Sequence, residues 1–275
     1  MRCRSLGFLA VLLTAPVAAP AQTNPFDGFN SGGRAQVYMD PALYAQYKAQ
    51  WLARVEALPE NVDVLEGAAD FFMIRDRPLA QELLERARDL EPKNPKWIQK
   101  LALLHRLNAS SGDVTEAIAA LSLMERANAM DPSQRTTLTD LPAMAFDAGD
   151  FEKARAYAER LLKQAGSDPT KWNYGDAVHK GNLMLGRIAV REGRLADAVT
   201  FLRASAEIPG SPVLSSFGPN MTLARDLLEY GEREAVLAYF EMCRAFWKMG
   251  GDRLDAWTRD VQAGNVPNFG ANLRY

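Results

Sequence analysis

A short unit that recurs along this chain constrains its fold more than any other feature of the sequence. Its clearest copy, Gly149–Leu162, is a glycine-led turn followed by a helix-forming stretch with alanines along one side. Similar stretches begin at Gly193 and Gly231, and a weaker copy begins at Arg75. Alanine lets two helix backbones approach closely, so each copy is suited to pack against a second helix. Repetition of such pairs predicts a stacked, all-α architecture.

The first complete helix pair is expected between Asn61 and Pro92, where Glu91-Pro92 ends the second helix. Small and aromatic residues recur here at the spacing of the tetratricopeptide repeat (TPR) family, whose unit is a helix-turn-helix of about 34 residues. The matching residues are Ala68, Phe71, Ala80, Ala87 and Pro92. Further copies begin near 94, 135, 174 and 217, so the resemblance covers most of residues 61–248. It implies an all-α, right-handed superhelical solenoid of about five TPR-like repeats.

Shorter segments flank the repeat region of residues 61–248. Asp40-Pro41 combines a capping carboxylate with proline at the first helical position, which predicts an N-terminal capping helix over residues 40–58. Residues 249–275 are expected to form a C-terminal capping helix and a tail that docks on the last repeats. Residues 22–39 are rich in Gly, Asn and Ser, which is typical of a flexible leader.

The first 21 residues have the pattern of a cleaved secretory signal peptide. Arg2 and Arg4 precede a short apolar run over residues 6–13, and Ala19-Pro20-Ala21 provides small residues for cleavage. No later stretch is long and apolar enough to span a bilayer, so no integral membrane segment is expected after cleavage. The chain is therefore predicted to be periplasmic or secreted.

Charge and cysteine content exclude several function classes. Removing residues 1–21 takes away two arginines and no acid, so the formal net charge moves from −2 to −4. No basic block or stripe is present, which argues against a nucleic-acid partner. Cys243 is the single cysteine left, and it occupies a small-residue position of a repeat, where a buried cysteine acts as a small hydrophobe. The two histidines lie far apart in sequence, so no metal site, and no cofactor, is expected.

The TPR resemblance implies a concave groove lined by the first helix of each repeat. Carried onto this chain, the lining positions hold mostly apolar side chains, which would suit an extended peptide or a helix of a partner protein. The alternative interpretation is that several of these residues pack beneath neighbouring repeats. The groove residues predicted in this way are Leu65, Phe72, Ile98, His105, Phe146, Leu183, Arg187 and Val190.

A second set of polar residues lies where the repeat pattern is interrupted. His179 and Asn182 are three residues apart and share one helix face, which is expected to meet the loop over residues 210–220 with its Ser211 and Asn220. The set is either a polar pocket for a ligand or a buried brace that positions the fifth repeat. This stretch also resembles a group of exported bacterial TPR proteins without an established activity, and that resemblance implies nothing about a reaction.

These features together predict a non-catalytic scaffold or assembly factor of the bacterial envelope that binds a protein or an extended peptide. The competing hypothesis is a small-ligand binder or an enzyme that uses a polar pocket at the junction of repeats four and five. The sequence predicts neither the identity of the partner nor the oligomeric state.

Overall fold

The structure is a computed structural model that describes residues 31–110, 112–132, 135–171 and 173–273. Over these residues the chain forms fourteen α-helices, two short 3-10 helices and no strand. In chain order the α-helices are α1 (Ser31–Met39), α2 (Pro41–Ala57), α3 (Val62–Phe72), α4 (Arg77–Leu90), α5 (Pro95–Ala109), α6 (Val114–Met130), α7 (Arg135–Asp147), α8 (Phe151–Ala165), α9 (Tyr174–Arg191), α10 (Leu195–Ala206), α11 (Pro212–Phe217), α12 (Thr222–Glu229), α13 (Arg233–Cys243) and α14 (Gly251–Gln262). The 3-10 helices are η1 (Lys248–Gly250) and η2 (Gly270–Leu273).

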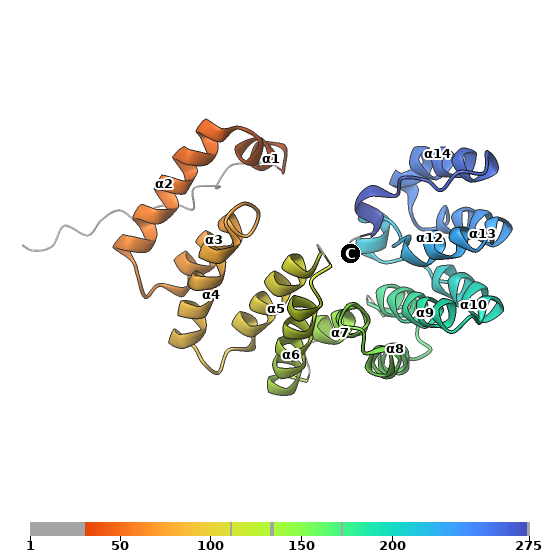
Figure 1. The fold of residues 1–275 in the computed structure, drawn as a ribbon, viewed down its shortest axis with the longest axis horizontal. Helices are drawn as coiled ribbons and strands as arrows, with labels where there is room; N and C mark the ends of the chain where they lie inside the picture. Colours follow the sequence, from red (N-terminus) through yellow and green to blue (C-terminus); the bar gives the residue numbers. More distant parts are fainter. Residues whose placement is uncertain (1–30, 111, 133–134, 172, 274–275) are drawn as a thin grey trace, which may run out of the picture.

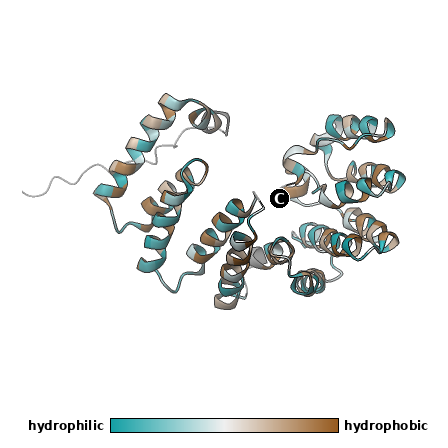
Figure 2. Cartoon of the chain, viewed as in Figure 1, coloured by the Kyte–Doolittle hydropathy of each residue, from teal (hydrophilic) through white to brown (hydrophobic). Residues whose placement is uncertain are grey.

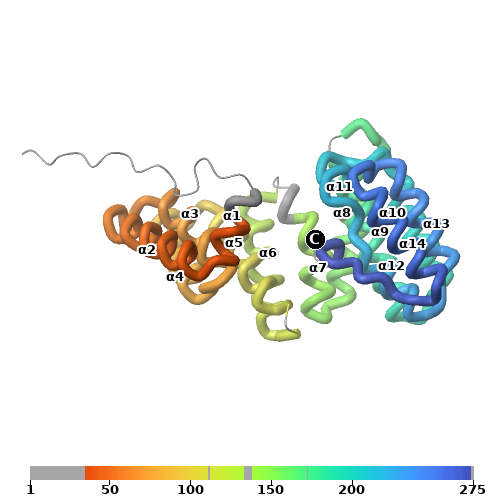
Figure 3. Tube along the Cα trace, turned by 90° about the horizontal axis from the view of Figure 1, so that it is seen from above, coloured from red at the N-terminus to blue at the C-terminus, as the bar shows by residue number. Residues whose placement is uncertain are grey.

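Consecutive helices pack in pairs along an arc (Figure 1). Five first helices, α3, α5, α7, α9 and α12, form its inner row, and α4, α6, α8, α10 and α13 form its outer row. The view from above shows the same succession, with α2 and α14 at the two ends (Figure 3). The predicted all-α solenoid of about five helix pairs is thereby confirmed. None of the described helices has the length and apolarity needed to cross a bilayer.

The hydrophobic core runs between the helices in three consecutive clusters. Apolar and polar residues lie on different sides of most helices, as the brown and teal stripes of Figure 2 show. Alanines of the repeat pattern, such as Ala68, Ala80 and Ala87, are fully buried, whereas Trp97 and Phe71 fill the spaces beside them. Each pair therefore completes its core with the next pair, as expected for a repeat protein.

The prediction of a flexible leader over residues 22–39 is wrong for its last nine residues, which form α1. Val37 is fully buried, and the Tyr38 ring lies 5.6 Å from the ring of Phe71 in α3. Tertiary docking, rather than local periodicity, accounts for this helix. The rest of the leader and the predicted signal peptide lie outside the described residues.

Candidate functional site

Ion pairs connect every inner helix to the next one, and the sign of the pairing residues alternates along the row. Helices α3, α7 and α12 contribute carboxylates, and α5 and α9 contribute basic side chains. The pairs are Glu66–Lys100 and Asp70–Lys100 (α3 to α5), Arg106–Asp147 (α5 to α7), Asp140–Lys180 (α7 to α9) and Arg187–Asp226 (α9 to α12). The alternation neutralises most of the charge on the inner row.

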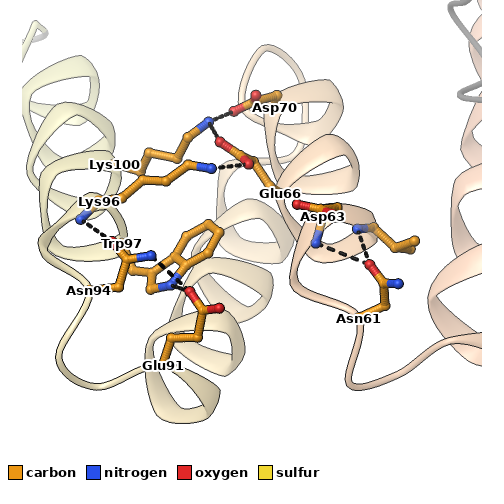
Figure 4. A network of polar contacts seen from close by, with 10 residues as sticks. Asn61, Asp63, Glu66, Asp70, Glu91, Asn94, Lys96, Trp97 and Lys100 are labelled. Atoms are coloured by element: carbon orange, nitrogen blue, oxygen red, sulfur yellow. Dashed lines mark hydrogen bonds and ion pairs between the residues drawn. The ribbon is translucent and has the colours of Figure 1, made fainter.

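The densest of these networks joins α3 to α5 (Figure 4). The Lys100 ammonium lies 3.0 Å from Glu66 and 2.6 Å from Asp70, and Lys96 also pairs with Glu66. Partial burial tends to raise the pKa of Glu66, but the hydrogen bonds from the two lysines outweigh it and hold the pKa below its ordinary value. In the preceding turn, the Trp97 indole donates a hydrogen bond of 2.9 Å to Glu91.

The apolar residues predicted to line the groove lie in the core instead. None of the six has more than 9% of its surface exposed: Leu65, Phe72, Ile98, Phe146, Leu183 and Val190. A shift of one residue turns a side chain by about 100° around a helix, which is enough to move it from the open face to the packed side. The family register therefore selected the residues between the inner helices rather than those facing the groove.

Three exposed apolar side chains lie near the C-terminal ends of α3 and α5. Leu103 and Leu107 follow Lys96 and Lys100 at three- and four-residue spacings, so they continue the face of α5 that carries these two lysines. They are 38% and 41% exposed, and Ile74, just after α3, is 57% exposed. We call Ile74, Leu103 and Leu107 the apolar stripe.

The two polar residues predicted for the groove have partners within the protein. His105 is half-buried, and its Nδ1 lies 2.6 Å from the Glu116 carboxylate of the outer helix α6. The Arg187 Nε donates to Asp226 at 3.0 Å, and its guanidinium lies 4.1 Å from the centre of the Phe146 ring. Of the two, only Arg187 takes part in the ion pairs between inner helices.

His179 is buried and links two segments of main chain. The Asn220 N–H donates to His179 Nε2 at 3.0 Å, so the ring carries its proton on Nδ1, which donates to the Ser205 carbonyl at 2.9 Å. Burial lowers the pKa of His179 to about 4, with a smaller contribution from the charge of Lys180. Both ring nitrogens are therefore used within the protein, and the ring is neutral near pH 7.

The other three polar residues of this junction point to different partners. The Ser211 hydroxyl donates to Asp176 at 2.9 Å and accepts from the Leu214 N–H at 3.0 Å. The Asn220 Oδ1 accepts from the main-chain N–H and the hydroxyl of Thr222, the first residue of α12, at 2.8 and 2.6 Å. The Asn182 amide donates to the Val178 carbonyl of its own helix. The structure thus unites His179 with Asn220, and Ser211 with Asp176, in internal hydrogen bonds.

The C-terminal tail contains a buried polar residue, Asn272, that the sequence interpretation missed. The buried side-chain amide of Asn272 donates to the carbonyls of Phe217 (3.2 Å) and Pro219 (2.9 Å), and the main-chain carbonyl of Asn272 accepts from the Met221 N–H at 2.8 Å. The tail lies on the inner side of the arc beside α12 (Figure 1). It therefore covers part of the concave side at the C-terminal end and leaves the apolar stripe open.

Metal and thiol chemistry find no support in the geometry. Across the described part of the chain, no group of three or more His, Cys, Asp or Glu residues could hold a metal ion. Cys243 is buried, and burial raises the pKa of its thiol well above the ordinary value.

Comparison with known proteins finds no matching family model and no matching curated protein. Among solved structures, the crystal structure of MamA is similar to this chain, with 17% sequence identity and a TM-score of 0.47. The similarity covers 65% of this chain and 94% of that one.

Proposed function

We propose that this protein is a non-catalytic member of the TPR family that binds a segment of another protein on its concave side. The observation that carries the proposal is the apolar stripe of Ile74, Leu103 and Leu107. Exposed apolar side chains that gather on a preformed surface favour protein binding, because a partner side chain can remove them from water.

The charges of the inner row support the same partner chemistry. The lysines beside the apolar stripe are already paired with Glu66 and Asp70, so an apolar segment can settle there without leaving a buried charge unpaired. The main chain on both sides is helical and offers few free polar groups. Binding would therefore rely on apolar anchors from the partner.

The proposed role is that of a scaffold or assembly factor in the bacterial envelope. Its support is the predicted signal peptide over residues 1–21, which would direct the chain out of the cytoplasm. A non-catalytic role is favoured because His179 and Cys243, the residues best suited to acid-base or nucleophilic work, are buried and, for His179, hydrogen-bonded on both nitrogens.

Site-specific photo-crosslinking in the native cells tests the proposal. A photoreactive residue at Leu103 or Leu107 is expected to capture a defined partner, because both side chains face the proposed site. The matched control is Ile118 on the outer helix α6, which is 54% exposed and equally apolar. Crosslinks of the same intensity and identity at all three positions would exclude the concave side as the binding surface.

A double substitution measures how much the apolar stripe contributes to partner binding. Leu103→Glu with Leu107→Glu is expected to reduce recovery of the co-purified partner at least about tenfold, because two charges would be forced against an apolar segment. Val114→Glu with Ile118→Glu, at more exposed apolar sites on α6, should leave recovery unchanged. Circular dichroism of both variants checks that the fold is retained.

A further inference from the structure

Arg191 differs from the other basic side chains of the inner row. Among the lysines and arginines of the inner row whose side chains the structure describes, it alone forms no ion pair with a carboxylate, whereas Arg187, one turn earlier on the same helix face, is paired with Asp226. The acidic residues that adjoin Arg191 and Phe146 in the chain, Glu192 and Asp147, already have basic partners. Glu192 pairs with Arg155 and Arg194, and Asp147 pairs with Arg106.

Two aromatic rings hold the Arg191 guanidinium in place. Its central carbon lies 4.3 Å from the centre of the Phe151 ring and 5.8 Å from that of Phe146. The two rings meet edge to face at 5.2 Å, and Phe146 also carries the Arg187 guanidinium at 4.1 Å. Stacking uses the flat face of a guanidinium and leaves the N–H groups along its edge available for a bidentate acceptor.

The charge of this cluster is positive in a chain whose net charge is negative. Asp226 is shared by Arg187 and Arg225, so the four residues Arg187, Arg191, Arg225 and Asp226 carry a formal charge of about +2. The Arg225 Nε is buried and has no acceptor in the described part of the protein. An anion placed beside Arg191 would balance this excess.

We propose that Arg191, with Arg187 beside it, binds the side-chain carboxylate of a glutamate or aspartate in the partner segment. This inference rests on the proposed function and specifies the chemistry of the partner. Planar guanidinium groups match the two oxygens of a carboxylate. The inner row continues from α9 to α12, so a bound chain has surface on both sides of Arg191. A side chain, rather than a chain terminus, therefore fits this place.

Two small probes test the site without knowledge of the partner. The signals of the arginine Nε–H groups are followed by NMR while N-acetylglutamic acid α-amide is added, which carries only a side-chain carboxylate. Saturable shifts of Arg191 and Arg187 are expected, whereas N-acetylglutamine, which carries only a main-chain carboxylate, should bind more weakly. Shifts of Arg191 no larger than those of the exposed Arg203 on α10 would overturn the proposal, as would equal binding of the two probes.

A substitution connects the site to partner binding. Arg191→Gln is expected to abolish the saturable shift at Arg187 and to reduce recovery of the crosslinked partner about tenfold. Arg203→Gln, in an exposed pair on the outer helix α10, serves as the control and should change neither result. If the probe binds but Arg191→Gln and the apolar-stripe variant retain the partner, the proposed function fails. If only the apolar-stripe variant loses the partner, the carboxylate inference fails.

Discussion

Helices α5 and α9 occupy equivalent places in the inner row, yet their surroundings differ. Helix α5 keeps an open face with Lys96, Lys100, Leu103 and Leu107. Helix α9 is buried along most of its length, because α7, α8, α10, α11 and α12 all pack on it. The same repeat unit thus leaves one helix face exposed in α5 and is largely enclosed in α9.

Small residues make the enclosure of α9 feasible. A Cβ atom added to Gly175 would lie 2.2 Å from the Gly210 carbonyl oxygen, and one added to Gly186 would lie 2.2 Å from the Leu223 side chain. Both glycines allow a neighbouring segment to approach the helix closely. The loop over residues 210–220 can then reach His179, whose Nε2 accepts a hydrogen bond from the Asn220 N–H and holds the loop against α9. The glycines of α9 thus stand where neighbouring segments approach it most closely.

The two histidines of the chain lie one on each helix, so substituting them tests the difference between α5 and α9 most directly. His179→Ala is expected to lower the free energy of unfolding by roughly 4 kcal/mol, since it leaves the Ser205 carbonyl and the Asn220 N–H buried without a partner and opens a cavity. His105→Ala should cost about 1 kcal/mol or less, because its contact with Glu116 is partly exposed. Urea unfolding followed by circular dichroism measures both, and equal losses would contradict the distinction.

Acid should destabilise the protein through the same residue. Burial lowers the pKa of His179 to about 4, whereas an unfolded chain gives histidine a pKa of about 6.5. Between these values the unfolded state binds more protons, so this contribution is complete above about pH 6.5 and is lost as the pH falls toward 4. The loss is roughly 3 kcal/mol at most. The free energy of unfolding should differ less between pH 7 and pH 4.5 in His179→Gln than in the wild type, and an equal difference in both proteins would refute the assignment.

Glycine substitutions test how tightly α9 is packed against its neighbours. Gly175→Ala should lower the free energy of unfolding by roughly 2 kcal/mol, because the new Cβ meets a main-chain oxygen that cannot easily move. Gly251 is the first residue of α14 and has open space around it. Gly251→Ala should therefore change the free energy of unfolding by no more than about 0.5 kcal/mol. Thermal unfolding of the two variants measures both changes in stability. A smaller loss at Gly175 than at Gly251 would show that α9 is less tightly covered than its contacts indicate.

Removal of the ion pairs between α3 and α5 should have the smallest effect on the free energy of unfolding. Lys100→Met removes the contacts with Glu66 and Asp70 and is expected to cost about 1 kcal/mol, since the side chains involved are only partly exposed. The difference from the wild type should shrink in high salt, which screens such pairs. Arg203→Met, from an exposed pair, should have no measurable effect. A loss at Lys100 that does not depend on salt would indicate packing by its methylene groups instead.

Local sequence signals were sufficient for the repeated helix pairs. Alanines such as Ala68, Ala80 and Ala154 mark close helix contacts at fixed spacing, and Asn61, like other capping residues, marks a helix start within a few residues of it. These signals act over one or two turns of helix, so they can be recognised without knowledge of the neighbours. The five pairs, the two end helices and the C-terminal position of the tail could all be predicted.

The sequence alone determined the all-α repeat architecture of this protein, whereas the tertiary structure decided which surfaces stay open. The docking of α1, the burial of Leu65 and Phe72, and the contacts of His179 and Asn272 all depend on residues distant in the chain. Asn272 meets Pro219 across 53 residues, and His179 meets Asn220 across 41. The physical reason is that a side chain turns by about 100° with each helical residue, so only the final placement of the neighbouring helices settles whether it faces core or groove.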